Sequence, residues 1–158
     1  MRKYFILSLF LAPLVFSQGN NNSDFEAKGF FAPSGPPTET PVRMEVGKSC
    51  LVELKQSYKI SGTFSGSLEI DYRILVDGPC NKPAGTYDEE WIAFGTFNGT
   101  INEKSVTGKF SYTANVKAGG DINGKIIFGQ GVEGELNVRG NFKDGKLSYD
   151  GWTKKIEF

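Results

Sequence analysis

An unbroken alternation of residue types over residues 58–76 constrains the fold more than any other feature. The even-numbered positions are apolar, aromatic or glycine, and the odd-numbered positions are polar except Leu75. Because successive side chains of a strand point to opposite faces, this pattern predicts extended chain with one buried face and one face in water. At about 3.3 Å per residue a straight strand of this length would outrun a small domain. We therefore expect a long strand that bends or divides at Gly62 or Gly66.

Shorter segments with the same period flank this stretch, and turn residues separate them. No helical period of ten residues or more is found after the first 17 residues. Residues 77–88 read as a loop, and the expected strands lie at residues 43–46, 51–54, 91–101, 106–116, 125–128, 132–142 and 149–158. We predict an all-β fold, a single antiparallel eight-stranded barrel, because closure removes the exposed edges of a sheet.

The N-terminal segment has the composition of a secretory signal peptide. Arg2 and Lys3 precede an apolar run that is too short to span a membrane. We predict a signal peptide over residues 1–17, with a retained membrane anchor as the alternative. The protein would then be secreted: extracellular, or periplasmic in a Gram-negative bacterium.

The segment over residues 18–41 is rich in Asn, Ser, Pro and Gly, which predicts a flexible leader. Its Phe30-Phe31 pair could dock on the domain that follows. That barrel domain is expected to occupy residues 42–158. Asn21 and Asn98 lie in glycosylation sequons, whose use the sequence leaves open.

Charge and composition exclude several classes of function. Without Arg2 and Lys3 the chain keeps 16 basic against 18 acidic residues, which argues against nucleic acid or an anionic membrane as partner. No later apolar run is long enough for a membrane span. The chain has no histidine, which removes the usual general base, most zinc sites and any Ser-His-Asp arrangement. We expect no metal and no cofactor.

The two cysteines, Cys50 and Cys80, are predicted to form a disulfide. An even pair in an oxidising compartment is more often bridged than free. Closing a loop of 30 residues would stabilise the fold by about 3.5 kcal/mol in the chain-entropy model. The alternative, a reactive thiol, would need a neighbour that lowers its pKa.

Several segments combine spaced glycines with β-branched and aromatic residues, and their order resembles that of a known family. They are FSGSLE at 64–69, GTFNGTI at 95–101, GKF at 108–110, GQGVEGEL at 129–136 and VRG at 138–140. The chain resembles the allene oxide cyclase barrel superfamily over residues 58–158. It is most similar to the bacterial DUF3224-type domains of unknown function within that group.

The resemblance implies an eight-stranded antiparallel barrel. The plant allene oxide cyclases close a ring in a lipid-derived epoxide, and the similar dirigent proteins steer the coupling of phenoxy radicals. Both hold an unstable apolar ligand inside the barrel. No catalytic position of either group matches a residue here, so none is carried over, and a shared fold does not license shared chemistry.

Two sets of residues are candidates for a site. Aromatic side chains predicted to point inward could line a ligand cavity or fill the core: Phe64, Tyr72, Trp91, Phe97, Phe110 and Tyr112. Tyr58 and Phe142 are also expected inward. The carboxylates Asp88, Glu89 and Glu90 precede a strand and are expected at a barrel rim, where they are a solvated charge run or a source of one base. In an inverted barrel, Glu69, Asp71 and Arg73 would line the interior.

These observations lead to three hypotheses of function. The first is a non-catalytic binding module for a small hydrophobic ligand or for a partner. The second is an isomerase or cyclase of the allene oxide cyclase type that uses a carboxylate at the barrel mouth. The third is a structural component of an envelope or matrix. The sequence does not decide whether the protein is an enzyme, nor its oligomeric state.

Overall fold

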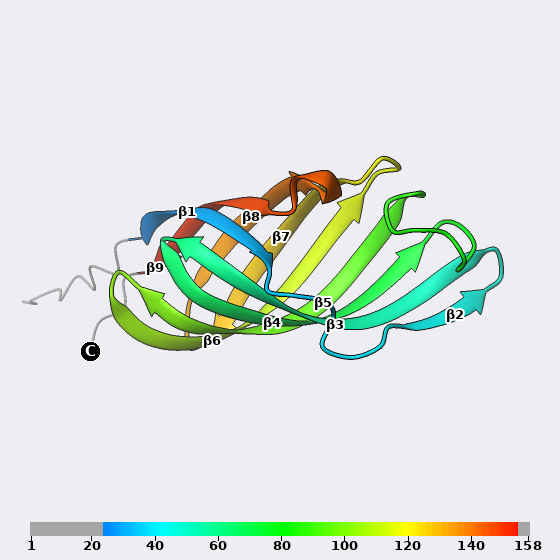
Figure 1. Ribbon diagram of the computed structural model, residues 1–158. Coiled ribbons are helices and arrows are strands. Elements are labelled where there is room, and N and C mark those ends of the chain that lie inside the picture. Colours follow the sequence, from blue (N-terminus) through cyan, green and yellow to red (C-terminus); the bar gives the residue numbers. More distant parts are fainter. Residues whose placement is uncertain (1–23, 155–158) are drawn as a thin grey trace, which may run out of the picture.

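The computed structural model describes residues 24–154, and they form nine strands and one short 3-10 turn (Figure 1). The elements in chain order are β1 (Asp24–Pro33), β2 (Val42–Val46), β3 (Ser49–Gly62), β4 (Phe64–Val76), β5 (Glu89–Ile101), β6 (Lys104–Val116), β7 (Asp121–Gln130), β8 (Gly134–Asn141), η1 (Phe142–Asp144) and β9 (Leu147–Lys154). The predicted signal peptide and Asn21 lie outside the described residues.

Antiparallel pairing closes eight of the strands into a barrel. Neighbouring strands follow the order β1-β9-β8-β7-β6-β5-β4-β3, and β1 also pairs with β3, which completes the ring. The ninth strand, β2, pairs with Ser49–Glu53 of β3, on the same edge of β3 that pairs with β1 farther along (Figure 1). The predicted all-β, eight-stranded barrel is therefore confirmed. No helix of the described part is long and apolar enough to cross a membrane.

The stretch over residues 58–76 divides into two strands instead of forming one bent strand. β3 ends at Gly62, which has a φ of 109°, and β4 begins at Phe64. The hairpin pairs residues of the same parity, such as Tyr58 with Leu68. Because directly opposite residues share a face, the alternation continues through the turn unchanged. A hairpin of this register and a bent strand therefore have the same sequence pattern.

The predicted faces of this hairpin are correct. Its buried side chains are all even-numbered: Tyr58, Ile60, Phe64, Leu68, Ile70, Tyr72 and Ile74. Glu69, Asp71 and Arg73 are exposed, so the barrel is not inverted.

The prediction of a flexible leader over residues 18–41 is wrong for Asp24–Pro33, which forms β1. This strand pairs with β9 from Asp24 to Phe31 and with β3 from Gly29 to Pro33. Phe31 is 1% exposed. Composition reports only what a segment can bury by itself, whereas β1 is held by backbone hydrogen bonds along both edges. The barrel domain begins here and not at residue 42.

Phe142 is also not where the pattern predicts it. The alternation of β8 ends when the Asn141 side chain accepts a hydrogen bond from the Lys143 N–H and caps η1. Phe142 is 38% exposed, and its ring packs on Trp91 at the end of the barrel, with the centroids 5.9 Å apart.

If β1 closes the barrel, Phe31→Ala should lower the free energy of unfolding by about 3–5 kcal/mol, the usual loss for a buried phenylalanine. The matched control is Phe30→Ala, since Phe30 is 49% exposed and its ring lies 4.8 Å from Lys146 Nζ in a cation-π arrangement; it should cost about 1 kcal/mol or less. Urea unfolding followed by circular dichroism measures both. If both variants lowered the free energy of unfolding by the same small amount, residues 24–33 would not form a strand of the barrel.

Candidate functional site

Three of the six candidate lining residues, Phe64, Phe97 and Phe110, meet around Phe128. The Phe64 and Phe128 rings are stacked with centroids 5.1 Å apart, and the Phe110 and Phe97 rings lie 5.3 Å and 6.4 Å from Phe128. All four side chains are buried. This cluster is made of rings alone and offers a ligand no polar group.

The other three, Tyr72, Trp91 and Tyr112, form a second cluster with Tyr58. Tyr72 contacts Trp91 edge to face at 5.4 Å and Tyr112 at 6.1 Å. The Tyr72 hydroxyl donates a hydrogen bond of 2.9 Å to the Tyr58 hydroxyl. The structure thus divides the six candidates into a phenylalanine cluster and a tyrosine cluster. Their role in lining a ligand stays a prediction.

The hydroxyl of Tyr112 is buried and has no hydrogen-bond partner among the described residues. The Tyr112 side chain is 0% exposed. Burial is the main reason that the pKa of Tyr112 and of Tyr72 lies well above the ordinary value of a phenol. Both hydroxyls therefore remain protonated at neutral pH.

Interior glycines are covered by aromatic rings. A Cβ added at Gly95 would lie 2.3 Å from the Phe110 ring, and one at Gly124 would lie 2.8 Å from the Tyr112 ring. Ring atoms therefore occupy the space that a larger residue would need. This arrangement is that of a packed core, in which glycine on one strand makes room for an aromatic residue on the next.

The three rim carboxylates line one hollow of about 280 Å³ at the end of the barrel, together with Asp77 and Lys117. They have different environments there. Asp88 accepts hydrogen bonds from Lys117 Nζ at 2.6 Å and from the Ala118 N–H at 2.8 Å. The Lys117 hydrogen bond is the main reason that the pKa of Asp88 lies below its ordinary value. Asp88 therefore pairs with the β6–β7 turn.

Glu89 is the one rim carboxylate that is buried, at 4% exposure. One oxygen accepts a hydrogen bond of 2.7 Å from the Gly85 N–H, and the other accepts one of 2.8 Å from Trp91 Nε1. The side chain thus ties the loop before β5 to the tyrosine cluster. Each Glu89 oxygen is held by one N–H donor. Glu90 is exposed.

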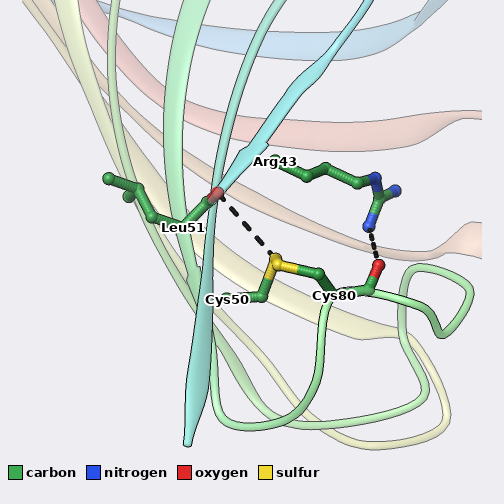
Figure 2. The surroundings of a disulfide bond; sticks show 4 residues. All are labelled: Arg43, Cys50, Leu51 and Cys80. Atoms are coloured by element: carbon green, nitrogen blue, oxygen red, sulfur yellow. Dashed lines mark hydrogen bonds between the residues drawn. A yellow bond between two sulfur atoms is a disulfide. The ribbon is translucent and has the colours of Figure 1, made fainter. Parts of the chain in front are cut away.

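The loop between β4 and β5 lies over this end of the barrel, and a disulfide holds it there. Cys50 and Cys80 are bridged, which confirms the predicted pairing (Figure 2). The Cys80 carbonyl oxygen accepts a hydrogen bond of 3.1 Å from Arg43 Nη1 on β2, and the Gly119 N–H donates one of 2.9 Å to the Gly85 carbonyl. These bonds join the loop to β2, to β3 and to the β6–β7 turn.

An apolar surface lies on the outer face of the barrel. Phe94 is 64% exposed, Ile92 58% and Val42 52%. All three line one groove of about 430 Å³ over β3, β4 and β5, and Phe94 also lines a second hollow of about 410 Å³. We call Val42, Ile92 and Phe94 the outer apolar surface.

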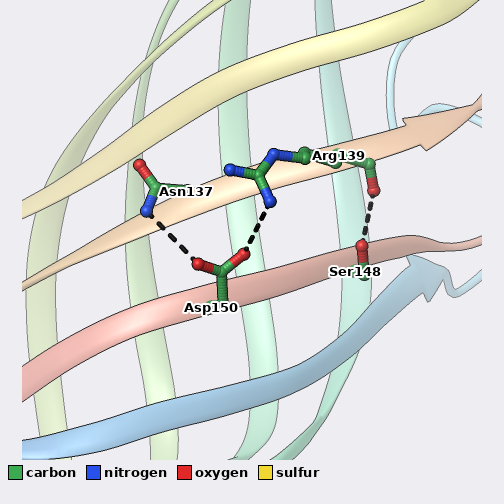
Figure 3. Close-up of polar contacts among 4 residues, drawn as sticks. All are labelled: Asn137, Arg139, Ser148 and Asp150. Carbon is green, nitrogen blue, oxygen red and sulfur yellow. Dashed lines mark hydrogen bonds and ion pairs between the residues drawn. The ribbon is translucent and has the colours of Figure 1, made fainter.

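The outer face of β8 and β9 has the opposite character. Asp150 accepts hydrogen bonds from Asn137 Nδ2 at 3.4 Å and from Arg139 Nη1 at 3.3 Å (Figure 3). The Ser148 hydroxyl donates to the Arg139 carbonyl. Apart from Trp152, the outward side chains of β8 and β9 are polar, and several of them bind one another, as expected for the water side of a sheet.

The comparisons identify no relative. No family model, no curated protein and no solved structure matches the chain. The resemblance to the allene oxide cyclase barrel superfamily therefore stays a prediction. Among residues 24–154 no group of three or more acidic or cysteine side chains could hold a metal ion.

Sequence reasoning missed Ile92 and Phe94, although a signal was present. Residues 91–94 read Trp-Ile-Ala-Phe, which is apolar on both faces of a strand. The flanking outward residues, Glu90 and Thr96, are polar. A local loss of alternation within an alternating strand indicates an apolar patch on its outer face, which is typical of an interaction surface.

Replacing Tyr112 with Phe should leave the free energy of unfolding unchanged or raise it by about 1 kcal/mol, because an unpartnered buried hydroxyl contributes no hydrogen bond and resists burial. Tyr72→Phe is the matched control and should cost about 1 kcal/mol, since it removes the bond to Tyr58. Denaturant unfolding of both variants tests this. A loss of more than 1 kcal/mol in Tyr112→Phe would show that the hydroxyl has a partner.

Alkaline pH should destabilise the fold. Burial raises the pKa of Tyr58, Tyr72 and Tyr112 in the folded chain. Above about pH 10 the unfolded chain loses these protons while the folded chain keeps them, so the free energy of unfolding falls by up to about 1.4 kcal/mol per pH unit for each tyrosine.

The measurement is urea unfolding at pH values from 7 to 11.5, with tyrosinate absorbance followed in parallel. The slope should be smaller in Tyr72→Phe, and the absorbance of the buried tyrosines should rise only with unfolding. Ionisation of these tyrosines in the folded state would contradict the buried arrangement.

Proposed function

We propose that this protein is a non-catalytic binding module that binds a partner protein through the outer apolar surface. The observation that carries the proposal is the exposure of Phe94, which is 64% exposed on a strand whose other outward positions are mostly polar. The outward residues Glu90, Thr96 and Asn98 on the same strand need no partner. Exposed apolar side chains that gather around a groove are typical of interaction surfaces.

The shape of the surface favours a macromolecule over a small ligand. Small-molecule sites are concave and enclose most of their ligand. The groove that Phe94 lines is open to solvent, and Phe94 also lines a second hollow of about 410 Å³. A partner protein could place side chains on both sides of Phe94 at once.

Charged side chains form the rim of this surface. Lys55 pairs with Glu39 at 2.7 Å, and Arg73 pairs with Glu53 at 3.2 Å. All four line the groove that holds Phe94. An apolar centre with a polar rim is the usual arrangement of protein interfaces, where the rim excludes water from the central contacts.

Two observations support binding without catalysis outside the cytoplasm. Both oxygens of Glu89, the buried rim carboxylate, are bound by N–H donors. The disulfide between Cys50 and Cys80 fits an oxidising compartment, which agrees with the secretion expected from the N-terminal sequence.

The test is a photo-crosslinking amino acid placed at position 94 of the protein in its native cells. Irradiation should give one defined adduct, and the mass of that adduct should be that of a different protein. The control position is Trp152, an outward residue of β9 that is 39% exposed; it should not give this adduct. After the partner is identified, Phe94→Ala should weaken binding by about 30-fold or more, as for a central contact residue, and Trp152→Ala should not.

Three outcomes would contradict the proposal. The first is no adduct at position 94, and the second is the same set of adducts at positions 94 and 152. The third is an adduct whose added mass is only that of a small molecule. That result would favour a small hydrophobic ligand over a partner protein.

A further inference from the structure

Within the described part of the chain, closure of the barrel leaves one edge of β2 without a partner strand. Within residues 24–154, β2 pairs only with β3, from Val42 opposite Glu53 to Val46 opposite Ser49. All five of its residues are exposed. Figure 1 shows β2 beside the start of β3, at one end of the barrel. An open edge presents unpaired N–H and C=O groups to any strand that can align with it.

The β2–β3 hairpin determines which backbone groups point outward. A two-residue turn, Gly47-Lys48, joins the strands, with a φ of 64° at Gly47. Residues that flank such a turn exchange backbone hydrogen bonds, and bonded pairs alternate along the ladder. The N–H and C=O groups of Val42, Met44 and Val46 therefore face β3. Those of Arg43 and Glu45 face away from it.

The sequence of β2 is complementary to itself in the antiparallel direction. It reads Val-Arg-Met-Glu-Val. When two copies run antiparallel about a two-fold axis at Met44, Val42 lies opposite Val46 and Arg43 lies opposite Glu45. The residues with outward backbone groups, Arg43 and Glu45, are then the ones that form hydrogen-bonded pairs, and their side chains have opposite charge.

A register must pair the residues whose backbone groups face away from β3, and it must place opposite charges across from each other. Other registers fail on one of these two requirements. A shift by one residue would pair Arg43 with Met44, whose backbone groups face β3. A shift by two would place Arg43 opposite Arg43, or Glu45 opposite Glu45, and like charges directly opposite are destabilising. Only the register centred on Met44 satisfies both the backbone groups and the charges.

We propose that two copies of this chain associate through β2, paired antiparallel about Met44. The association joins the sheets of both barrels into one continuous sheet. Val42 and Met44 of both copies lie on its outer face, because each is opposite an outward residue of β3. The outer apolar surfaces of the two copies then face the same side, so one dimer presents two binding surfaces. The pairing itself does not depend on what binds Phe94.

Sedimentation velocity over a range of concentrations tests the pairing with charge-reversal variants. The wild-type chain should form a weak dimer, because a five-residue edge makes a small interface. Arg43→Glu and Glu45→Arg should each be monomeric, since each places like charges opposite one another in its own dimer. A one-to-one mixture of the two variants should form a heterodimer, because the charges become complementary across it.

Glu45→Pro is an independent probe of the backbone. It removes an N–H that points away from β3, so the monomer should keep its fold by circular dichroism, while dimerisation should be lost. Met44→Cys should form an intermolecular disulfide on oxidation, because Met44 lies opposite its own copy in a pair with Cα atoms about 4.5 Å apart; Val46→Cys should not.

The proposal is overturned if the wild-type chain remains monomeric at every concentration, which would include the case in which another part of the chain covers β2. It is also overturned if the wild-type dimer persists in both single charge variants. The absence of a heterodimer in the mixture of two folded, monomeric variants would exclude this register.

Discussion

The barrel depends on the backbone pairing of β1 along both of its edges. One end of β1 pairs only with β9, its last residues pair with β3, and both partners are engaged from Gly29 to Phe31. The Lys28 carbonyl accepts a hydrogen bond from the Thr63 N–H, and the Lys28 N–H donates one to Thr63 Oγ1, both at 3.0 Å. The first strand is thereby joined to the β3–β4 turn. Without this strand the sheet would have two long open edges, and the aromatic interior would be open to water along the seam.

The interior of the closed barrel contains two aromatic clusters of different polarity. The phenylalanine cluster consists of apolar rings, and the neighbouring Tyr149 hydroxyl accepts a hydrogen bond of 3.0 Å from the Phe64 N–H. The tyrosine cluster places three hydroxyls in the core. Tyr58 and Tyr72 satisfy each other, and Tyr112 is left without a partner among the described residues. Trp91 of the tyrosine cluster donates a hydrogen bond to Glu89 at the end of the barrel, where the disulfide-bound loop lies. Aromatic rings pack over the interior glycines as in a protein core. The exposed apolar side chains lie on the outside of the barrel.

The outside is not uniform. Polar side chains on β8 and β9 bind one another and face water, while Ile92 and Phe94 on β5 are apolar and exposed. Near them, β2 lies outside the closed ring and keeps a free edge. Closure pairs the eight strands of the ring with one another, whereas β2 pairs only with β3 within residues 24–154. The unpaired edge of β2 thus lies close to the outer apolar surface, on the same side of the barrel, since Val42 of β2 lines the same groove as Ile92 and Phe94.

The sequence by itself predicted most strands from residue 42 onward, their buried faces and the disulfide, because a period of two is a local signal and the chain has one pair of cysteines. It also contained the outer apolar surface, as a loss of alternation at Ile92 and Phe94. Only the tertiary structure decided that the 58–76 stretch is a hairpin, since a same-parity register leaves the alternation intact. It also decided that the polar segment before residue 42 holds a strand, since that strand is stabilised by partners 25 to 130 residues away in the chain. The burial of Glu89, between the half-buried Asp88 and the exposed Glu90, followed from contacts with Gly85 and Trp91, which no spacing in the sequence specifies.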